Sequence, residues 1–121
     1  MTKGKVCLLL LSLLLFACGK GGDYEQMRKQ LMKAKTQNEN YEPFVSDSMM
    51  LSVADYFDRN GTANEKMLAH YLLGCVYRDL GDMPRSLECY HQAVACADTT
   101  DADCDYLLVG KVHGQMAYIY N

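Results

Sequence analysis

The chain of 121 residues has no tryptophan, only two prolines and no excess of basic residues. Twelve lysines and arginines stand against fifteen acidic residues, which gives a formal net charge of −3. Proteins that bind nucleic acid need clustered positive charge to neutralise phosphates. We therefore predict that this chain does not bind nucleic acid. Its aromatic side chains are mostly tyrosines, of which there are nine.

Motifs for catalysis are also missing. There is no glycine-rich phosphate loop, no recognisable pair of acid–base carboxylates and no cofactor fingerprint. The three histidines, His70, His91 and His113, fall in separate predicted helices. None belongs to a motif that would set it beside the serine or cysteine it would have to activate. We expect a protein that is not an enzyme and that carries no cofactor.

Metal-binding patterns are incomplete. Asp101, Asp103 and Asp105 alternate like the start of a calcium loop, but Tyr106 stands where the turn glycine belongs. Val112 replaces the bidentate glutamate of such a loop. No two cysteines have the C-x-x-C spacing of a structural zinc site. We predict no metal site, and we expect Asp103 or Asp105 to cap a helix instead.

The N-terminus carries the most specific feature that is present. Two early lysines precede residues 6–17, an almost unbroken apolar run. The run has the length of a signal peptide and is shorter than the roughly 20 residues that span a bilayer. It closes with Leu15-Phe16-Ala17-Cys18, which resembles the lipobox of bacterial lipoproteins. The resemblance implies removal of residues 1–17 and lipidation of Cys18. The alternative is an ordinary secretory signal with a chance cysteine.

The resemblance also implies a location. Residues 18–22 would form a glycine-rich tether between a lipid anchor and the folded part. Loss of residues 1–17 would leave ten basic and fifteen acidic residues, a net charge of −5. We expect the protein on the extracytoplasmic, periplasmic face of a membrane. Gly19 favours the outer membrane, because aspartate at this position retains some lipoproteins in the inner membrane.

The apolar spacing predicts an all-α chain of antiparallel helical hairpins. A first helix is expected over 23–35, and the polar stretch 36–42 before Pro43 is predicted not to be helical. Ser46 or Asp47 should cap a second helix, which is expected to end near residue 60.

Capping signals mark the later helices. Thr62 and Glu65 are spaced as a capping box at the start of a third helix. Pro84 suits the first turn of a fourth helix, which is predicted to end near Ala97. An acidic connection follows over 98–105, and a last helix runs from about residue 105 to residue 120.

The third and fourth helices carry a repeat signature. Its residues are Leu73-Gly74, Tyr77, Gly81-Asp82, Ser86, Tyr90 and Ala93. In type and spacing they resemble a tetratricopeptide repeat, which we place at 62–98. Residues 23–61 read as a degenerate hairpin, and 105–121 read as the first helix of an incomplete repeat. In that helix Met116-Ala117-x-x-Tyr120 echoes the signature 43 residues later, against the usual spacing of 34.

The resemblance to this family implies a binding surface. Its first helices line a concave groove, which here would hold Leu68, Tyr71, Cys75, Arg78 and Asp79. The Lys and Asn with which one subset of the family grips a peptide carboxylate are not at these positions. We expect a protein or peptide partner for the groove. The alternative is that these side chains only pack against the helix at 46–60.

Lipobox and lengthened repeats together resemble the anchored repeat lipoproteins of the Bacteroides group. The leading interpretation is a membrane-anchored adaptor that binds a protein. Two alternatives stay open: the truncated sensory input region of a longer signalling protein, and an accessory lipoprotein of a transport or assembly complex.

The last predicted helix has no partner helix to cover it. Its apolar residues would form a partly open edge: Val109, Val112, Met116, Ile119 and Tyr120. Repeats bury their apolar surface against neighbours, so we expect either a truncated member of a longer family or self-association through this helix.

Four cysteines remain besides the predicted anchor, in a compartment that permits disulfides. A bridge between Cys96 and Cys104 would close the acidic connection. We favour the alternative, in which the four are small thiols packed between helices.

Overall fold

The computed structural model describes residues 2–121, with side chains from residue 21 onward. It contains five helices and, among these residues, no strand. The helices are α1 (Thr2–Glu39), α2 (Ser48–Asn60), α3 (Ala63–Asp79), α4 (Met83–Cys96) and α5 (Tyr106–Tyr120). The predicted all-α class is confirmed. The predicted lipidation site, Cys18, lies outside the described side chains.

The chain divides into two units, residues 1–30 and residues 31–121. The described part of the first unit is helical and belongs to α1. Its described side chains, from residue 21 onward, are exposed or half-buried. The sequence predicts a separate tether at 18–22, but the two described glycines of that segment, Gly21 and Gly22, lie within α1. Among the residues that the structure describes, no helix has both the length and the apolar character needed to cross a bilayer.

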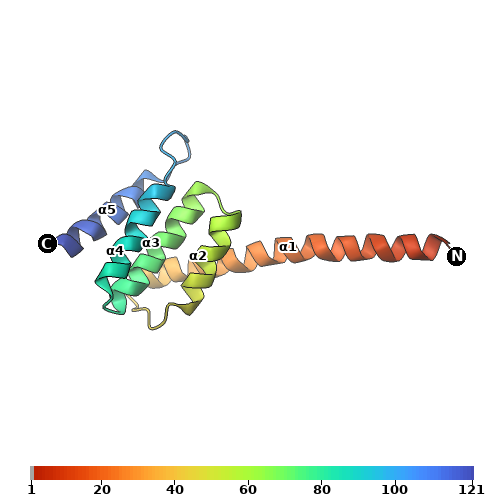
Figure 1. The fold of residues 1–121 in the computed structure, drawn as a ribbon, viewed down its shortest axis with the longest axis horizontal. Helices are drawn as coiled ribbons and strands as arrows, with labels where there is room; N and C mark the ends of the chain where they lie inside the picture. The colour runs from red at the N-terminus through yellow and green to blue at the C-terminus, as the bar shows by residue number, and fades with distance from the viewer. Residues whose placement is uncertain (1) are drawn as a thin grey trace. The chain divides into compact units, whose positions relative to one another are not determined.

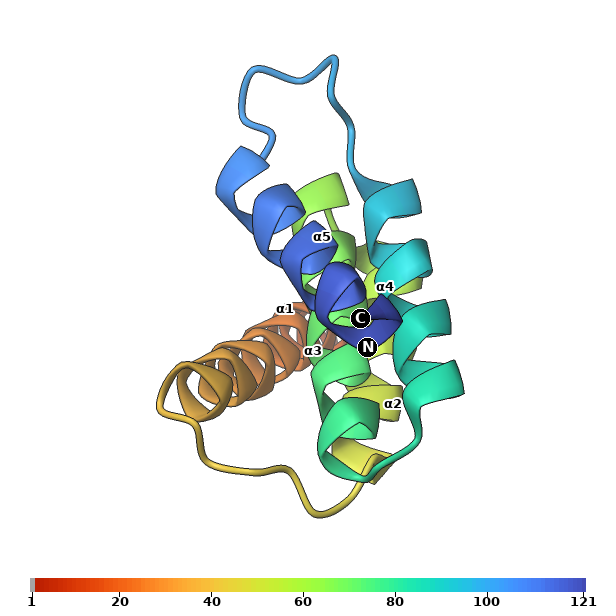
Figure 2. The same cartoon turned by 90° about the vertical axis from the view of Figure 1, so that its left-hand side faces the viewer.

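In the second unit α3 is the central helix. It packs most extensively against α4 and less extensively against α2, while α5 packs mainly on α4 and at fewer points on α3 (Figure 1). The loop that joins α4 to α5 extends beyond the ends of both helices (Figure 2). Residues 69–77 of α3 are all buried, as expected for a helix with neighbours on several sides.

The apolar core draws on every helix of this unit. Phe57, Leu72, Val76, Tyr90 and Val112 are all completely buried. Leu31 and Ala34, the predicted apolar positions near the end of α1, are completely buried as well. Burial of side chains of this size contributes roughly 1.5–3 kcal/mol each, so the core accounts for most of the fold's stability.

Local capping signals are confirmed. The Oγ1 atom of Thr62 accepts from the amide of Glu65 at 3.2 Å, and the Glu65 carboxylate accepts from the Thr62 amide at 3.0 Å. Asp82 accepts from the Arg85 amide at the start of α4. The side chain of Asp105 caps α5 in the same way. Each cap satisfies an amide at a helix start that would otherwise lack a partner.

One prediction near the start of the second unit is wrong. α1 continues to Glu39 through the stretch predicted not to be helical, because Pro43 restricts only its immediate neighbour and cannot end a helix several residues earlier. The helix ends instead where Tyr41 takes a left-handed backbone conformation with φ 57°. Asp47 stands at the N-cap of α2 as predicted, but its carboxylate accepts from the Tyr77 hydroxyl at 2.9 Å. The Oγ atom of Ser46, the other predicted cap, accepts from the Ser48 amide at 3.3 Å.

The predicted open edge of α5 is corrected in part. Val112 and Met116 are buried, and Val109 and Ile119 are half-buried. Tyr120 is exposed as expected. The strongly exposed apolar residues of α5 are Tyr106, Leu107, Tyr118 and Tyr120. The helix therefore turns its valines and Met116 inward and leaves its tyrosines on the surface.

Candidate functional site

A cleft of about 710 Å³ opens in the second unit between the first, third and fifth helices. The end of α1 and the turn after it contribute one wall, α3 the floor and α5 the other wall. The lining residues are Asn38, Glu39, Tyr41, Tyr71, Arg78, Lys111, Gly114, Gln115 and Tyr118. The cleft is thus lined by the first helix of each predicted pair and by no residue of α2 or α4.

The structure brings two of the five predicted groove residues into this cleft. Tyr71 and Arg78 line it, whereas Leu68, Cys75 and Asp79 do not. Cys75 is completely buried, and its Sγ atom accepts a hydrogen bond from the Tyr90 hydroxyl at 3.6 Å. The Asp79 carboxylate accepts hydrogen bonds from the backbone amide of Phe44 and from the side chain of Arg78. The observed cleft therefore extends beyond the predicted groove residues of α3, because residues of α1 and α5 also line it.

Arg78 lies at the floor of the cleft with every guanidinium nitrogen engaged. Its Nε donates to Oδ1 of Asp79 at 3.0 Å. One terminal nitrogen donates to Oε1 of Gln115 at 3.2 Å, and the other donates to Oδ1 of Asn38 at 3.0 Å. The side chain keeps 24% of its surface exposed. Arg78 thus connects α1, α3 and α5.

Tyr71 forms the apolar part of the floor. It is 7% exposed, and its ring lies 6.0 Å from the ring of Tyr90. Burial raises the pKa of the Tyr71 phenol to about 12, while a hydrogen bond with Asn38 acts in the opposite direction. The phenol therefore stays neutral over the physiological range.

Two exposed tyrosines stand at the rim. Tyr41 is 93% exposed and Tyr118 is 74% exposed. The left-handed backbone of Tyr41 is costly for a bulky residue, and such conformations gather at functional sites. Exposed aromatic side chains beside a cleft are typical anchors for protein partners. The rim is therefore suited to contact with a side chain that enters between α1 and α5.

Among the described residues, one cation of the cleft lining has no ion-pair partner. Glu39 pairs with Lys35 at 3.7 Å, and Arg78 pairs with Asp79. Lys111 is exposed and pairs with no acidic residue of the described chain. The local charge balance at the α5 wall is therefore positive, although the whole chain is acidic.

The cleft residues that α1 and α5 contribute were not among the predicted groove residues, although the repeat spacing of the sequence does indicate those in α5. The repeat signature returns after 43 residues, and the same offset relates three predicted groove positions to positions in α5. Position 68 corresponds to Lys111, position 71 to Gly114 and position 75 to Tyr118. All three of these α5 residues line the cleft. Asn38 and Tyr41 carried no such signal, because the end of α1 was predicted not to be helical.

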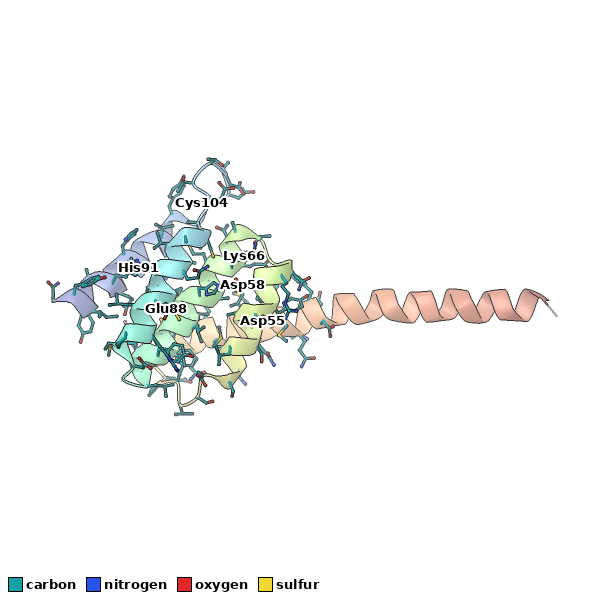
Figure 3. All side chains as sticks on the ribbon, in the orientation of Figure 1. Asp55, Asp58, Lys66, Glu88, His91 and Cys104 are labelled. Atoms are coloured by element: carbon teal, nitrogen blue, oxygen red, sulfur yellow. The ribbon has the colours of Figure 1, made fainter. Side chains whose placement is uncertain are left out.

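The remaining polar groups lie away from the cleft. Asp58 of α2 forms a hydrogen bond with His70 of α3 at 2.7 Å. Lys66 also lies on α3 (Figure 3). All four cysteines that the structure describes are free thiols, including Cys104 in the loop before α5. Burial raises the pKa of Cys75, Cys89 and Cys96. Within residues 21–121, no three His, Cys, Asp or Glu side chains are arranged to hold a metal ion.

In comparisons with known proteins, no family model, no curated protein and no solved structure matches the chain.

Proposed function

We propose that the protein is a membrane-anchored extracytoplasmic lipoprotein whose tetratricopeptide-like helices bind a segment of a partner protein. Its role is recognition rather than catalysis. The observation that carries this proposal is the cleft between α1, α3 and α5, because it combines exposed tyrosines at the rim with a lysine that pairs with no acidic residue of the described part of the chain.

The cleft suggests the chemistry of the bound segment. Tyr41 and Tyr118 offer apolar surface that loses little side-chain entropy on binding. Lys111 offers a positive charge that no residue of the described chain neutralises. A segment with one large apolar or aromatic side chain beside an acidic residue would complement both features.

The anchor rests on the resemblance of Leu15-Phe16-Ala17-Cys18 to a lipobox. Lipid on Cys18 would hold the helices near the bilayer, because each buried methylene group contributes about 0.8 kcal/mol. Several acyl chains would then make dissociation very slow, and no cluster of basic residues is needed to attract the membrane. The partner would accordingly be a membrane or periplasmic protein.

Selection from a displayed library of random peptides of about twelve residues tests this function. The full-length chain in mild detergent serves as the target. We expect the recovered peptides to share an apolar or aromatic residue next to an acidic one. Binding of a labelled recovered peptide is measured by fluorescence anisotropy. Recovery without any shared pattern would contradict the proposal.

Charge reversal at the α5 wall sharpens the test. Lys111→Glu should weaken binding of the recovered peptide by about tenfold or more and reduce its sensitivity to salt. Lys66→Glu, which changes α3 outside the cleft, is the matched control and should leave binding unchanged. Equal affinities for Lys111→Glu and the unaltered chain would show that the peptide does not use this wall.

A further inference from the structure

The guanidinium of Arg78 is occupied by the protein itself. Its three hydrogen bonds go to Asn38 of α1, to its own neighbour Asp79 in α3 and to Gln115 of α5. These acceptors lie 40, 1 and 37 residues away along the chain. An arginine in this position bridges both walls of the cleft and keeps few donors for a ligand.

The two walls are attached to the rest of the unit in different ways. α5 packs mainly on α4 and less extensively on α3. The end of α1 is fixed by the buried side chains of Leu31 and Ala34. The bonds from Arg78 to Asn38 and Gln115 therefore link two walls that are anchored separately, beside the hydrogen bond between Asn38 and Tyr71.

Asp79 extends this network to the connection after α1. Its Oδ1 accepts from Arg78, and its Oδ2 accepts from the amide of Phe44 at 3.0 Å. Phe44 is 6% exposed, so the connection is held both by burial and by this bond. Arg78 and Asp79 together fix the segment that carries Tyr41, the exposed tyrosine on the α1 side of the rim.

We infer that Arg78 is a positioning residue, which fixes the spacing of the cleft walls through Asn38 and Gln115 and does not itself contact the bound segment. The inference builds on the proposed function: the exposed tyrosines at the rim contact the bound segment, while Arg78 at the floor fixes the distance between the walls. It also replaces the direct binding role that the sequence suggested for Arg78. The role requires the planar guanidinium of arginine, because each of its three nitrogens donates to a different acceptor. Lysine has the same charge, but its single nitrogen cannot lie within hydrogen-bonding distance of all three acceptors at once.

Hydrogen exchange of the full-length chain, followed by mass spectrometry without any ligand, tests the positioning role. Arg78→Lys and Arg78→Met should both raise exchange about tenfold in residues 31–41 and in α5. Exchange in the buried middle of α3 and α4 should stay the same. Unchanged exchange at both walls in both variants would overturn the inference.

Peptide binding then separates positioning from direct contact. Arg78→Lys should lose as much affinity for the recovered peptide as Arg78→Met does. Full binding by Arg78→Lys would overturn the inference, because it would show that charge alone suffices. The double variant Asn38→Asp/Gln115→Glu keeps both acceptors and makes them charged, so exchange at the walls should stay slow. Faster exchange in that variant would contradict the network.

Two further variants keep the test decisive. Gln115→Ala removes one bond to Arg78, and Asn38→Ala removes the bond to Arg78 together with the bond to Tyr71. Both preserve Arg78, so each should loosen mainly its own wall, and this result can be measured even if the Arg78 variants fail to fold. Tyr118→Ala should weaken binding without changing exchange. If the unaltered chain binds no library peptide, the proposed function fails, while the exchange measurement still decides the role of Arg78.

Discussion

Gly74 of α3 lies directly against Tyr90 of α4: a Cβ atom at residue 74 would come within 2.5 Å of the ring atom Cε1. The contact continues at Ser86, whose Oγ donates to the Gly74 carbonyl at 2.8 Å. Tyr90 and Ser86 are both completely buried. The lack of a side chain at residue 74 is therefore what allows α3 and α4 to form the most extensive helix pair of the described chain.

Gly74→Ala should destabilise the protein because the added methyl group has no room. Overpacking of this kind destabilises a protein by about 1–3 kcal/mol, which exceeds the stabilisation expected from the higher helix propensity of alanine. The measurement is urea unfolding followed by circular dichroism. Gly110→Ala is the matched control, since nothing lies within 4 Å of a Cβ there. It should stabilise the protein by about 0.5–1 kcal/mol. Two substitutions with effects of the same sign would contradict the described packing.

Alkaline pH should weaken the fold. In the unfolded chain the Tyr71 phenol ionises near pH 10, while burial raises its pKa in the folded protein to about 12. Between these values the unfolded state binds fewer protons, so the free energy of unfolding falls as pH rises. The contribution of Tyr71 is fully present below pH 10 and is lost as pH rises towards 12.

The thiol of Cys89 adds an earlier loss. Burial raises its pKa from 9.0 to about 11, so its contribution falls between those pH values. Urea unfolding repeated at increasing pH measures both effects. Tyr71→Phe should flatten the dependence above pH 10, and Cys89→Ala should flatten it from pH 9. A stability that rises over this range would show that the two groups are not buried as described.

Cys18→Ser should abolish lipid attachment. When the chain is produced in a bacterium that processes lipoproteins, an alkyne-tagged fatty acid should label the unaltered protein and send it to the membrane fraction. The serine variant should remain unlabelled, because serine has no sulfur atom for the thioether. Cys89→Ser, which changes a cysteine within α4, should label normally. Equal labelling of all three proteins would exclude a lipid anchor at Cys18.

Local signals let the sequence predict most of the fold. The capping box of Thr62 and Glu65 lies within one turn of helix, and so does the predicted cap of Asp105 on the Leu108 amide. The pairing of Gly74 with Tyr90 was predictable because the repeat signature brings both residues into one hairpin. These features depend on residues close in sequence, which pattern reasoning handles well.

The cleft could be predicted only in part. Tyr71 and Arg78 were found because the repeat signature lies in their own helix. The partners of Arg78, Asn38 and Gln115, lie 40 and 37 residues away, and no spacing rule connects them. The end of α1 was also missed, because a polar stretch before a proline has no apolar pattern to mark it as helical. Contacts between distant segments needed the three-dimensional structure.

The most direct test of recognition in the cleft compares two tyrosines of α5. Tyr118 lines the cleft and is 74% exposed, whereas Tyr120 is 68% exposed and hydrogen-bonds His91 of α4 at 3.3 Å. The measurement is the anisotropy of a labelled library peptide titrated with the full-length chain and with each alanine variant. Tyr118→Ala should weaken binding by about tenfold or more, and Tyr120→Ala should bind like the unaltered chain. Equal affinities of the two variants would contradict recognition in this cleft.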